Sequence, residues 1–255
     1  MRRTLVSAVA AAAVSASLFA AAPAQAAEVD ITGSGSSFAY NFINKCAQQY
    51  KAKTGNNVSY AATGSGAGRK ALVAKTVDFA ASDSPYGSSE AKPGHAITYA
   101  PVIGGAIAMV FNIDGVKELN LDAATIGGIF DGSITKWNDP EIIADNNRSV
   151  KSVVYKKTAS GNVAVDKSGK PIVLRNSTKN IYYTLPNKPI KVVFRSDTSG
   201  TSNNFTRFMN GVAPTVWTKP ANDAFTTAFP GNINDTANIG RIVGANGSQG
   251  VATLA

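Results

Sequence analysis

One stretch carries the pattern from which the architecture can be inferred: Val192-Val193-Phe194-Arg195-Ser196-Asp197-Thr198-Ser199-Gly200-Thr201-Ser202-Asn203-Asn204-Phe205. Its β-branched and aromatic start predicts a buried strand, and the apolar residues from Phe205 onward recur at helical spacing. A polar turn between a strand and a helix presents backbone N–H groups at the positive end of the helix dipole. Hydroxyls at Ser199 and Thr201 and the guanidinium of Arg195 add donors, so the stretch predicts a site for a phosphate-sized oxyanion.

A plain capped helix is the alternative for this stretch, because serine, threonine and glycine are also common at helix N-caps. Two further stretches follow the same plan. Residues 33–37 precede an apolar helical pattern that begins at Phe38, and residues 64–68 precede one that begins at Ala71. Three serine- and glycine-rich helix starts in one chain favour three arms of one pocket.

Strand and helix patterns alternate in the first part of the chain. Residues 29–31, 58–61 and 76–83 are typical of strands, and helices are expected between them. This alternation predicts an α/β fold with a parallel sheet, whose ligands collect beyond the carboxyl ends of the strands. Asp83 ends the third strand pattern, so its carboxylate is expected beside the serine-rich turns.

The first 26 residues have the composition of a secretory signal peptide. Two arginines precede an alanine-rich apolar run over residues 5–22, and small residues stand before Ala27. A transmembrane anchor is the alternative, but the run contains serines and ends in a cleavage pattern. We therefore expect export to the periplasm or the cell surface. Cys46 lies too far from the cleavage site to be the lipid-bearing cysteine of a lipoprotein.

The chain without its first 26 residues is basic, with 23 Lys and Arg against 16 Asp and Glu, a net charge of +7. The basic residues are not interleaved with stacking aromatics, so nucleic acid is not an expected partner. Cys46 is the only cysteine, which excludes an intramolecular disulfide, and we expect it to be buried as a small apolar residue. His95 is the only histidine, so we expect no metal site and no Ser-His-Asp triad. We also expect no cofactor.

Three further features lie beyond the first run of alternating strands and helices. Residues 97–111 form a long apolar run interrupted by two glycines, which favours a crossing between two lobes over a single buried strand. Trp137 and Trp217 are expected to pack in the core. Residues 149–188 predict a basic surface β-hairpin, which is either a solvated decoration or a partner-binding arm.

Five segments in order resemble the phosphate-binding proteins of ABC phosphate importers. They are TGSGSSF at 32–38, GSGAG at 64–68, TVDFAASD at 76–83, Phe-x-Gly-x-Ile-x-x-Trp within 129–139, and RSDTSGT at 195–201. The resemblance implies a two-lobed periplasmic-binding-protein fold, with parallel-rich sheets flanked by helices and phosphate in the cleft between lobes. We expect lobe I over 27–105 and lobe II over 106–255. It further implies a monomer that delivers phosphate to membrane permease subunits and is not an enzyme.

The resemblance also implies a set of phosphate ligands, carried over position by position: Ser37, Phe38, Ser65, Asp83, Arg195, Ser199, Gly200 and Thr201, with Asp197 orienting Arg195. Asp83 would select the anion, a role that also follows from physical chemistry. A carboxylate in a dry cleft repels an oxyanion unless the anion brings a proton to donate. Phosphate near neutral pH has such a proton and sulfate does not, so Asp83 is predicted to reject sulfate.

Two departures from the family pattern leave alternatives open. Ser37 replaces the family's threonine and keeps the hydroxyl. Family members usually continue past residues 250–252 with a strand that returns to the first lobe, whereas this sequence ends at Ala255. We therefore expect the return to lobe I to be missing, either because the sequence is a fragment or because this version closes its lobe differently.

Two rival functions complete the set of hypotheses. A secreted phosphatase could use Ser199 or Ser37 as nucleophile, but neither has a base beside it in the sequence, and no metal-ligand cluster is present. A surface adhesion or signalling protein could use the basic hairpin at residues 149–188, and that role could coexist with phosphate binding.

Overall fold

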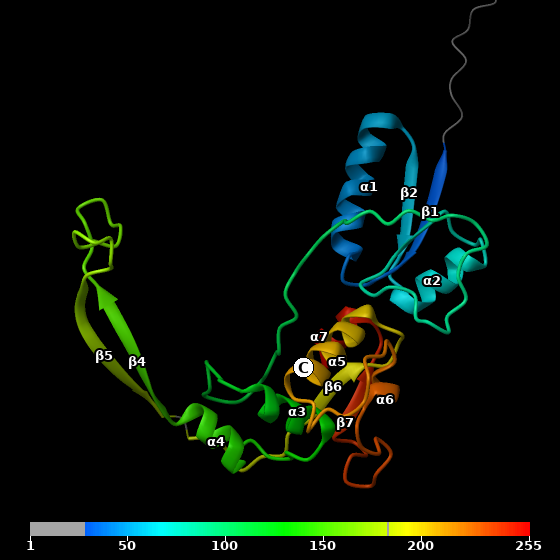
Figure 1. Ribbon diagram of the computed structural model, residues 1–255. Helices are drawn as coiled ribbons and strands as arrows, with labels where there is room; N and C mark the ends of the chain where they lie inside the picture. Colours follow the sequence, from blue (N-terminus) through cyan, green and yellow to red (C-terminus); the bar gives the residue numbers. More distant parts are fainter. Residues whose placement is uncertain (1–28, 183) are drawn as a thin grey trace, which may run out of the picture.

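The computed structural model describes residues 29–255 apart from residue 183, so the signal peptide predicted for residues 1–26 lies outside the described part. In its first part, strands and helices alternate as the sequence predicts (Figure 1). The elements are β1 (Asp30–Gly35), α1 (Tyr40–Thr54), β2 (Asn57–Ala61), α2 (Ser65–Val73) and β3 (Phe79–Ala81). The three strands form a parallel sheet in the order β2-β1-β3.

The second part contains another parallel pair, β6 with β7. Its elements are α3 (Ala123–Asp131), α4 (Pro140–Asn146), β6 (Val192–Arg195), α5 (Gly200–Val212), α6 (Phe225–Ala228), β7 (Ile242–Ala245) and α7 (Gly247–Leu254). Parallel strands with helices between them confirm the predicted α/β class. The division into lobes at residues 105 and 106 stays a prediction.

Short-range signals set the helix boundaries in this second part. The Asp122 carboxylate accepts a 2.8 Å hydrogen bond from the Thr125 N–H and caps α3, which ends at Gly132 in the left-handed conformation with φ of 90°. Asp139 caps α4 in the same way, and Pro140 occupies the first helical position, where its missing N–H costs nothing. Local sequence alone therefore dictates where these helices begin.

Residues 97–111 form neither helix nor strand and are almost entirely exposed. The alternative of a buried strand is therefore wrong for this run. In Figure 1 the segment passes, in green, from the region of the first sheet down to α3. Its apolar side chains include Tyr99, Val102, Ile103, Ile107 and Val110, which are 44–77% exposed.

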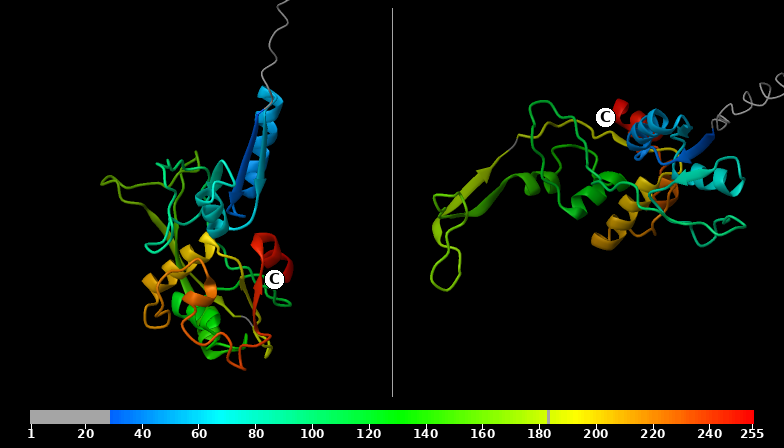
Figure 2. Two further views of the ribbon diagram at one scale, coloured as in Figure 1. Left: turned by 90° about the vertical axis from the view of Figure 1, so that its right-hand side faces the viewer. Right: turned by 90° about the horizontal axis from the view of Figure 1, so that it is seen from above.

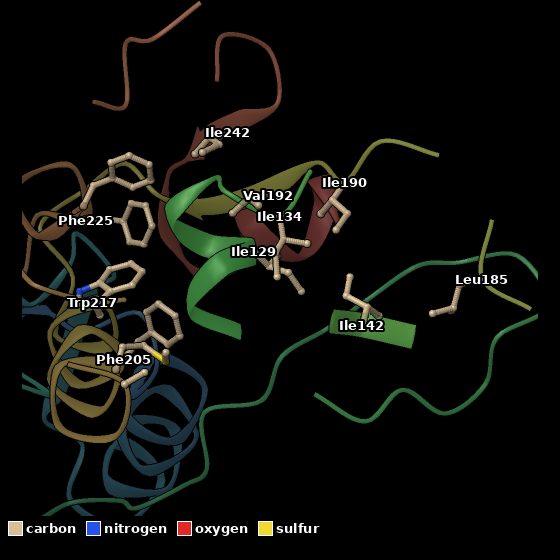
Figure 3. Close-up of a cluster of buried hydrophobic side chains, with 13 residues drawn as sticks. Ile129, Ile134, Ile142, Leu185, Ile190, Val192, Phe205, Trp217, Phe225 and Ile242 are labelled. Carbon is tan, nitrogen blue, oxygen red and sulfur yellow. The ribbon is translucent and has the colours of Figure 1, made fainter. Parts of the chain in front are cut away.

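The main hydrophobic core lies in the second part (Figure 3). Trp217 is fully buried at its centre, with its ring 5.6 Å from Phe205 and 6.0 Å from Phe225 between centroids. Trp137 is partly buried and packs against the same cluster. Both tryptophans are therefore core residues, as predicted.

The first part has a much smaller core, in which Ala39, Ile43 and Tyr60 are the buried apolar residues and Phe79 packs against them. Helix α1 presents only Ile43 to this cluster as a buried residue. Cys46, one turn further along α1, is exposed, so the prediction of a buried thiol is wrong. The side of α1 that carries Cys46 faces an open cavity instead of a packed layer.

Strands β4 (Arg148–Tyr155) and β5 (Val173–Ile181) pair antiparallel within the segment where a hairpin is expected. Together they project away from the rest of the described chain (Figure 1, and the right-hand view of Figure 2). Among the residues described, we find no helix with the length and apolar character needed to span a bilayer.

Helix α5 offers a matched test of the core. Phe205 is 8% exposed and Phe208, three residues later, is 55% exposed. Phe205→Ala should lower the free energy of unfolding by about 3–5 kcal/mol, because a buried ring leaves a cavity. Phe208→Ala should change it by no more than about 0.5 kcal/mol. Urea denaturation followed by tryptophan fluorescence measures both, and equal losses would show that the core does not centre on Trp217.

Candidate anion-binding site

Within the described residues, four helices begin shortly after a parallel strand ends: α1 after β1, α2 after β2, α5 after β6 and α7 after β7. Hydrogen bonds join these starts to one another. The Gly66 N–H at the start of α2 donates to the Thr198 carbonyl before α5 at 3.0 Å. The hydroxyls of Ser37 before α1 and Ser248 in α7 lie 2.8 Å apart. Four positive helix ends therefore meet at the junction between the two sheets.

The Asp83 carboxylate lies at this junction and contacts several of the predicted residues. The Thr201 hydroxyl donates to Oδ2 at 3.2 Å, and the Asp83 backbone N–H donates to the Ser65 hydroxyl at 3.2 Å. A side chain at Gly200 would come within 2.7 Å of the Asp83 Cβ and 2.8 Å of the Ser65 hydroxyl. The structure thus brings Ser65, Asp83, Gly200 and Thr201 together, and the close approach requires glycine at 200.

Ser36, which the sequence analysis did not single out, holds the other carboxylate oxygen. Its hydroxyl donates to Asp83 Oδ1 at 2.5 Å, and the residue is 1% exposed. The Tyr60 hydroxyl donates to the Ser36 carbonyl at 2.9 Å. Burial, and secondarily the Asp83 charge, raises the pKa of Tyr60, so this phenol remains a donor across the physiological range.

The predicted pair Ser37 and Phe38 lies at the edge of this arrangement. The Ser37 hydroxyl accepts from the Ser248 N–H at 3.1 Å and therefore faces α7. The Phe38 ring is 39% exposed and lies against Gly105, where a side chain would come within 2.8 Å of it. The ring thus turns toward apolar surroundings, and any contribution of Phe38 to a site would come from its backbone.

Arg195 is buried and held by Asp197, as the sequence analysis expects. Its Nε donates to Asp197 Oδ1 at 2.6 Å, its Nη2 bonds Oδ2, and its Nη1 donates to the Ser248 hydroxyl at 3.3 Å. The Gly247 N–H also donates to Asp197. Burial alone would raise the pKa of Asp197, but Arg195 and Gly247 hold it below its ordinary value. Asp197 is therefore a charged anchor for the guanidinium.

Ser199 has the bonding of an ordinary N-cap, which is the alternative weighed for this stretch. Its hydroxyl accepts from the Ser202 N–H at 3.3 Å, and its own N–H donates to the Asp223 carbonyl at 3.0 Å. The residue is 1% exposed. In this conformation the Ser199 hydroxyl is engaged inside α5, whereas the Thr201 hydroxyl points to Asp83.

A second charged group, missed from the sequence, joins the two parts of the chain. Arg69 in α2 is 5% exposed and donates to Glu90, to Asp223 Oδ2 at 2.9 Å, and to the Ser84 hydroxyl at 2.9 Å. The Ser84 hydroxyl in turn donates to Asp223 Oδ1 at 2.9 Å. Burial opposes the charged form of Arg69, but the two carboxylates raise its pKa above the ordinary value. This network fixes Ser84, the residue after Asp83, against the second part of the chain.

A largely apolar cavity of about 1440 Å³ opens beside the site. Most of its wall is formed by the exposed run 97–109, by Phe38 just before α1, and by the α1 residues Phe42 and Tyr50. Asp83 and Thr201 contribute to its wall, together with a few other polar residues. The polar junction is thus one margin of an otherwise apolar opening.

A family model described as the PBP superfamily domain matches residues 20–253. The chain belongs to the PBP superfamily. Similar curated proteins include phosphate-binding protein PstS2 of Mycobacterium bovis, 33% identical over 224 residues, which are 85% of this chain and 46% of that protein. Phosphate-binding protein PstS of Haemophilus influenzae is 36% identical over 185 residues, or 72% of this chain and 45% of the relative.

A third relative, phosphate-binding protein PstS of Xylella fastidiosa, is 30% identical over 231 residues, covering 90% of this chain and 51% of its own length. This PBP-superfamily chain thus spans about half the length of the curated relatives that it matches. Across residues 29–255 without residue 183, no three His, Cys, Asp or Glu side chains are grouped so that they could hold a metal ion.

The contribution of the Arg69 network to the stability of this PBP-superfamily chain can be measured by mutation, with an exposed ion pair as the control. Asp223→Asn should lower the free energy of unfolding by about 1.5–3 kcal/mol, because it weakens charged hydrogen bonds to a buried guanidinium. Asp114→Asn is the control, since the Lys188–Asp114 pair is 62% and 88% exposed and should leave urea denaturation unchanged. Indistinguishable midpoints for the two variants would remove the network from the stabilising contacts.

The Asp197 anchor should make stability depend on acid. The pKa of Asp197 is lower in the folded chain than the ordinary 3.8. Its contribution to the free energy of unfolding is therefore fully present above pH 3.8 and is lost as the pH falls through the lowered pKa of the folded state. Asp197→Asn should cost about 3 kcal/mol at pH 7 and flatten the loss of stability between about pH 5 and 2. Asp30→Asn, on the exposed start of β1, should retain the wild-type slope in the same denaturant titrations. An unchanged slope for Asp197→Asn would contradict the assignment.

Proposed function

We propose that this chain binds inorganic phosphate at the junction where Asp83 meets the helix starts. The observation that carries the proposal is the Asp83 carboxylate, held on one oxygen by Ser36 and bonded on the other by Thr201, among groups that otherwise donate to anions. A carboxylate in an anion site needs a ligand that brings its own proton. Monohydrogen and dihydrogen phosphate do so, and arsenate shares that chemistry.

The remaining ligands in the proposal are donors. Backbone N–H groups at the starts of α1, α2 and α5, among them those of Phe38 and Gly200, would donate to the phosphate oxygens. The hydroxyls of Ser37, Ser65, Ser199 and Thr201 would add to them, with Ser199 and Ser37 exchanging their present partners for the ligand. Arg195, anchored by Asp197, would supply the positive charge. The names of the relatives, all phosphate-binding proteins, support this choice of anion.

The proposed activity is capture and delivery without covalent chemistry. The chain would be exported by its leader, act as a monomer outside the cytoplasm, bind phosphate between lobes at 27–105 and 106–255, and pass it to permease subunits of an importer. Closure around the ligand would be favoured only by contacts made from both lobes. The rival phosphatase finds less support, because Ser37 and Ser199 are bonded to Ser248 and to the Ser202 N–H and neither hydroxyl is bonded to a base.

Calorimetric titration of the chain from Ala27 onward, with phosphate and separately with sulfate, tests the proposal. Asp83→Asn should weaken phosphate binding roughly 10–100-fold, because a charged acceptor of the ligand's proton is lost, and should relax the rejection of sulfate. Asp78→Asn, the same substitution on an exposed carboxylate that bonds Thr32, is the control and should bind as wild type does.

Three outcomes would count against the proposal. Folded wild-type protein that takes up no phosphate would show that this chain does not have the function, and wild-type discrimination by Asp83→Asn would remove Asp83 from selection. Release of p-nitrophenol from p-nitrophenyl phosphate by the same preparation would favour the enzyme.

A further inference from the structure

The β4–β5 ribbon lacks the burial that normally stabilises a sheet. Its strands pair from Arg148 with Ile181 to Tyr155 with Val173, and the residues described on both faces are exposed except for the half-buried Val154 and Ser177. Two-stranded ribbons are at best marginally stable when neither face is covered. The ribbon nevertheless extends well away from the helices and from the candidate anion site (Figures 1 and 2).

The outer end of the ribbon is folded into a defined shape. The Lys156 N–H donates to the Ile172 carbonyl, and the Ala164 N–H donates to the Lys156 carbonyl. The Ile172 N–H donates to the Ala164 carbonyl, so residues near 164 fold back between the two strand ends. A tight turn at 166–170 closes this tip, with Asp166 accepting from the backbone of Ser168 and Lys170. The backbone of the tip is therefore folded into a defined shape.

The ribbon is strongly positive. Residues 149–181 contain seven Lys and Arg and a single acid, Asp166. The Asp166 carboxylate is occupied within its own turn, and its bonds to Ser168 and Lys170 lower its pKa. Four of the cations belong to the outer end: Lys156, Lys157, Lys167 and Lys170. A surface of this kind complements an anionic partner.

Exposed apolar side chains lie among these lysines. Val163, Val165, Val173 and Leu174 are 46%, 54%, 51% and 63% exposed. A soluble polyanion would gain nothing from them, whereas a lipid surface accepts apolar side chains below its head groups while lysines remain among the phosphates. The combination of lysines and apolar side chains on one projecting tip favours a membrane over other anionic partners.

We propose that the outer end of the ribbon, residues 155–174, docks onto a membrane surface rich in anionic phospholipid. The lysines would contact the head groups, and Val163, Val165 and Leu174 would enter the interface. Because the ribbon carries this surface away from α2 and α5 (Figure 1), docking would leave the starts of these helices accessible. The proposal needs no membrane-spanning helix and is independent of which anion the core binds.

Co-sedimentation with vesicles tests the proposal on the chain from Ala27 onward, so that the apolar leader cannot contribute lipid binding. Vesicles of pure phosphatidylcholine are compared with vesicles that contain roughly 30% phosphatidylglycerol. The negative charge of these vesicles attracts lysines within about one Debye length of the lipid surface. Wild type should bind the anionic vesicles, lose binding in high salt, and show little affinity for the neutral ones.

Two variants with equal charge separate position from net charge. Replacing Lys156, Lys157, Lys167 and Lys170 by Gln should lower partitioning by roughly 100-fold or more, since each lysine near such a surface contributes roughly fivefold. The matched control replaces four exposed lysines elsewhere, Lys45, Lys53, Lys75 and Lys117, and should bind nearly as wild type does. Thermal unfolding of both variants verifies that the core is intact.

A third variant separates lipid from polyanion. Val163→Ser, Val165→Ser and Leu174→Ser together should lower vesicle binding at least roughly tenfold, since apolar burial is lost, while binding to inorganic polyphosphate beads should not change. Equal vesicle binding by the two lysine variants would overturn the proposal, as would absence of binding by wild type. Unchanged vesicle binding by the serine variant would assign the tip to a polyanion instead of a membrane.

Discussion

Pairing of buried charges governs the junction between the two parallel sheets. Arg69 and Arg195 are both less than a tenth exposed, and an unpaired cation at that depth would cost several kcal/mol. Each is therefore paired with acidic side chains, Arg69 with Glu90 and Asp223 and Arg195 with Asp197. These bonds fix the turns that precede the helices, since Asp197 also accepts from Gly247 and Ser84 also bonds Asp223. The positions of the helix starts thus follow from where the charges find partners.

Polar contacts matter here because apolar contacts are unevenly distributed. The cluster around Trp217 comprises thirteen buried apolar residues, whereas the cluster under α1 comprises three. Hydrophobic stabilisation is roughly proportional to the apolar area removed from water, so the first part gains far less from its own core. Phe42 and Tyr50 remain exposed along the wall of the large cavity, opposite the exposed run 97–109. The bonds of Arg69 and Ser84 to Asp223 are consequently among the polar contacts that attach the first part to the second, together with the Gly66–Thr198 and Asp83–Thr201 bonds.

The sequence predicted what depends on local pattern and missed what depends on distant pairing. Strand, turn and helix followed from periodicity, and the convergence of Ser65, Asp83 and Thr201 followed from the rule that ligands collect at strand ends. The sequence analysis named Ser37, but Ser36 is the residue that bonds Asp83. The two serines are adjacent, and the sequence pattern does not show which of their hydroxyls faces the carboxylate. Arg69 and Asp223 are 154 residues apart, and no local signal connects them. The burial of Cys46 was predicted wrongly because helical spacing identifies an apolar face but not whether anything covers it.

The two oxygens of Asp83 are held unequally, and this bears on how a ligand could enter the proposed phosphate site. Ser36 lies 2.5 Å from Oδ1 and is fixed in turn by Tyr60, while Thr201 lies 3.2 Å from Oδ2. A shorter bond from a buried donor is harder to replace than a longer one from a half-buried donor. An incoming proton donor would therefore displace the Thr201 hydroxyl and leave Ser36 in place. In that arrangement Ser36 orients the carboxylate, Oδ2 accepts from the ligand, and the released Thr201 hydroxyl can turn to a second ligand oxygen.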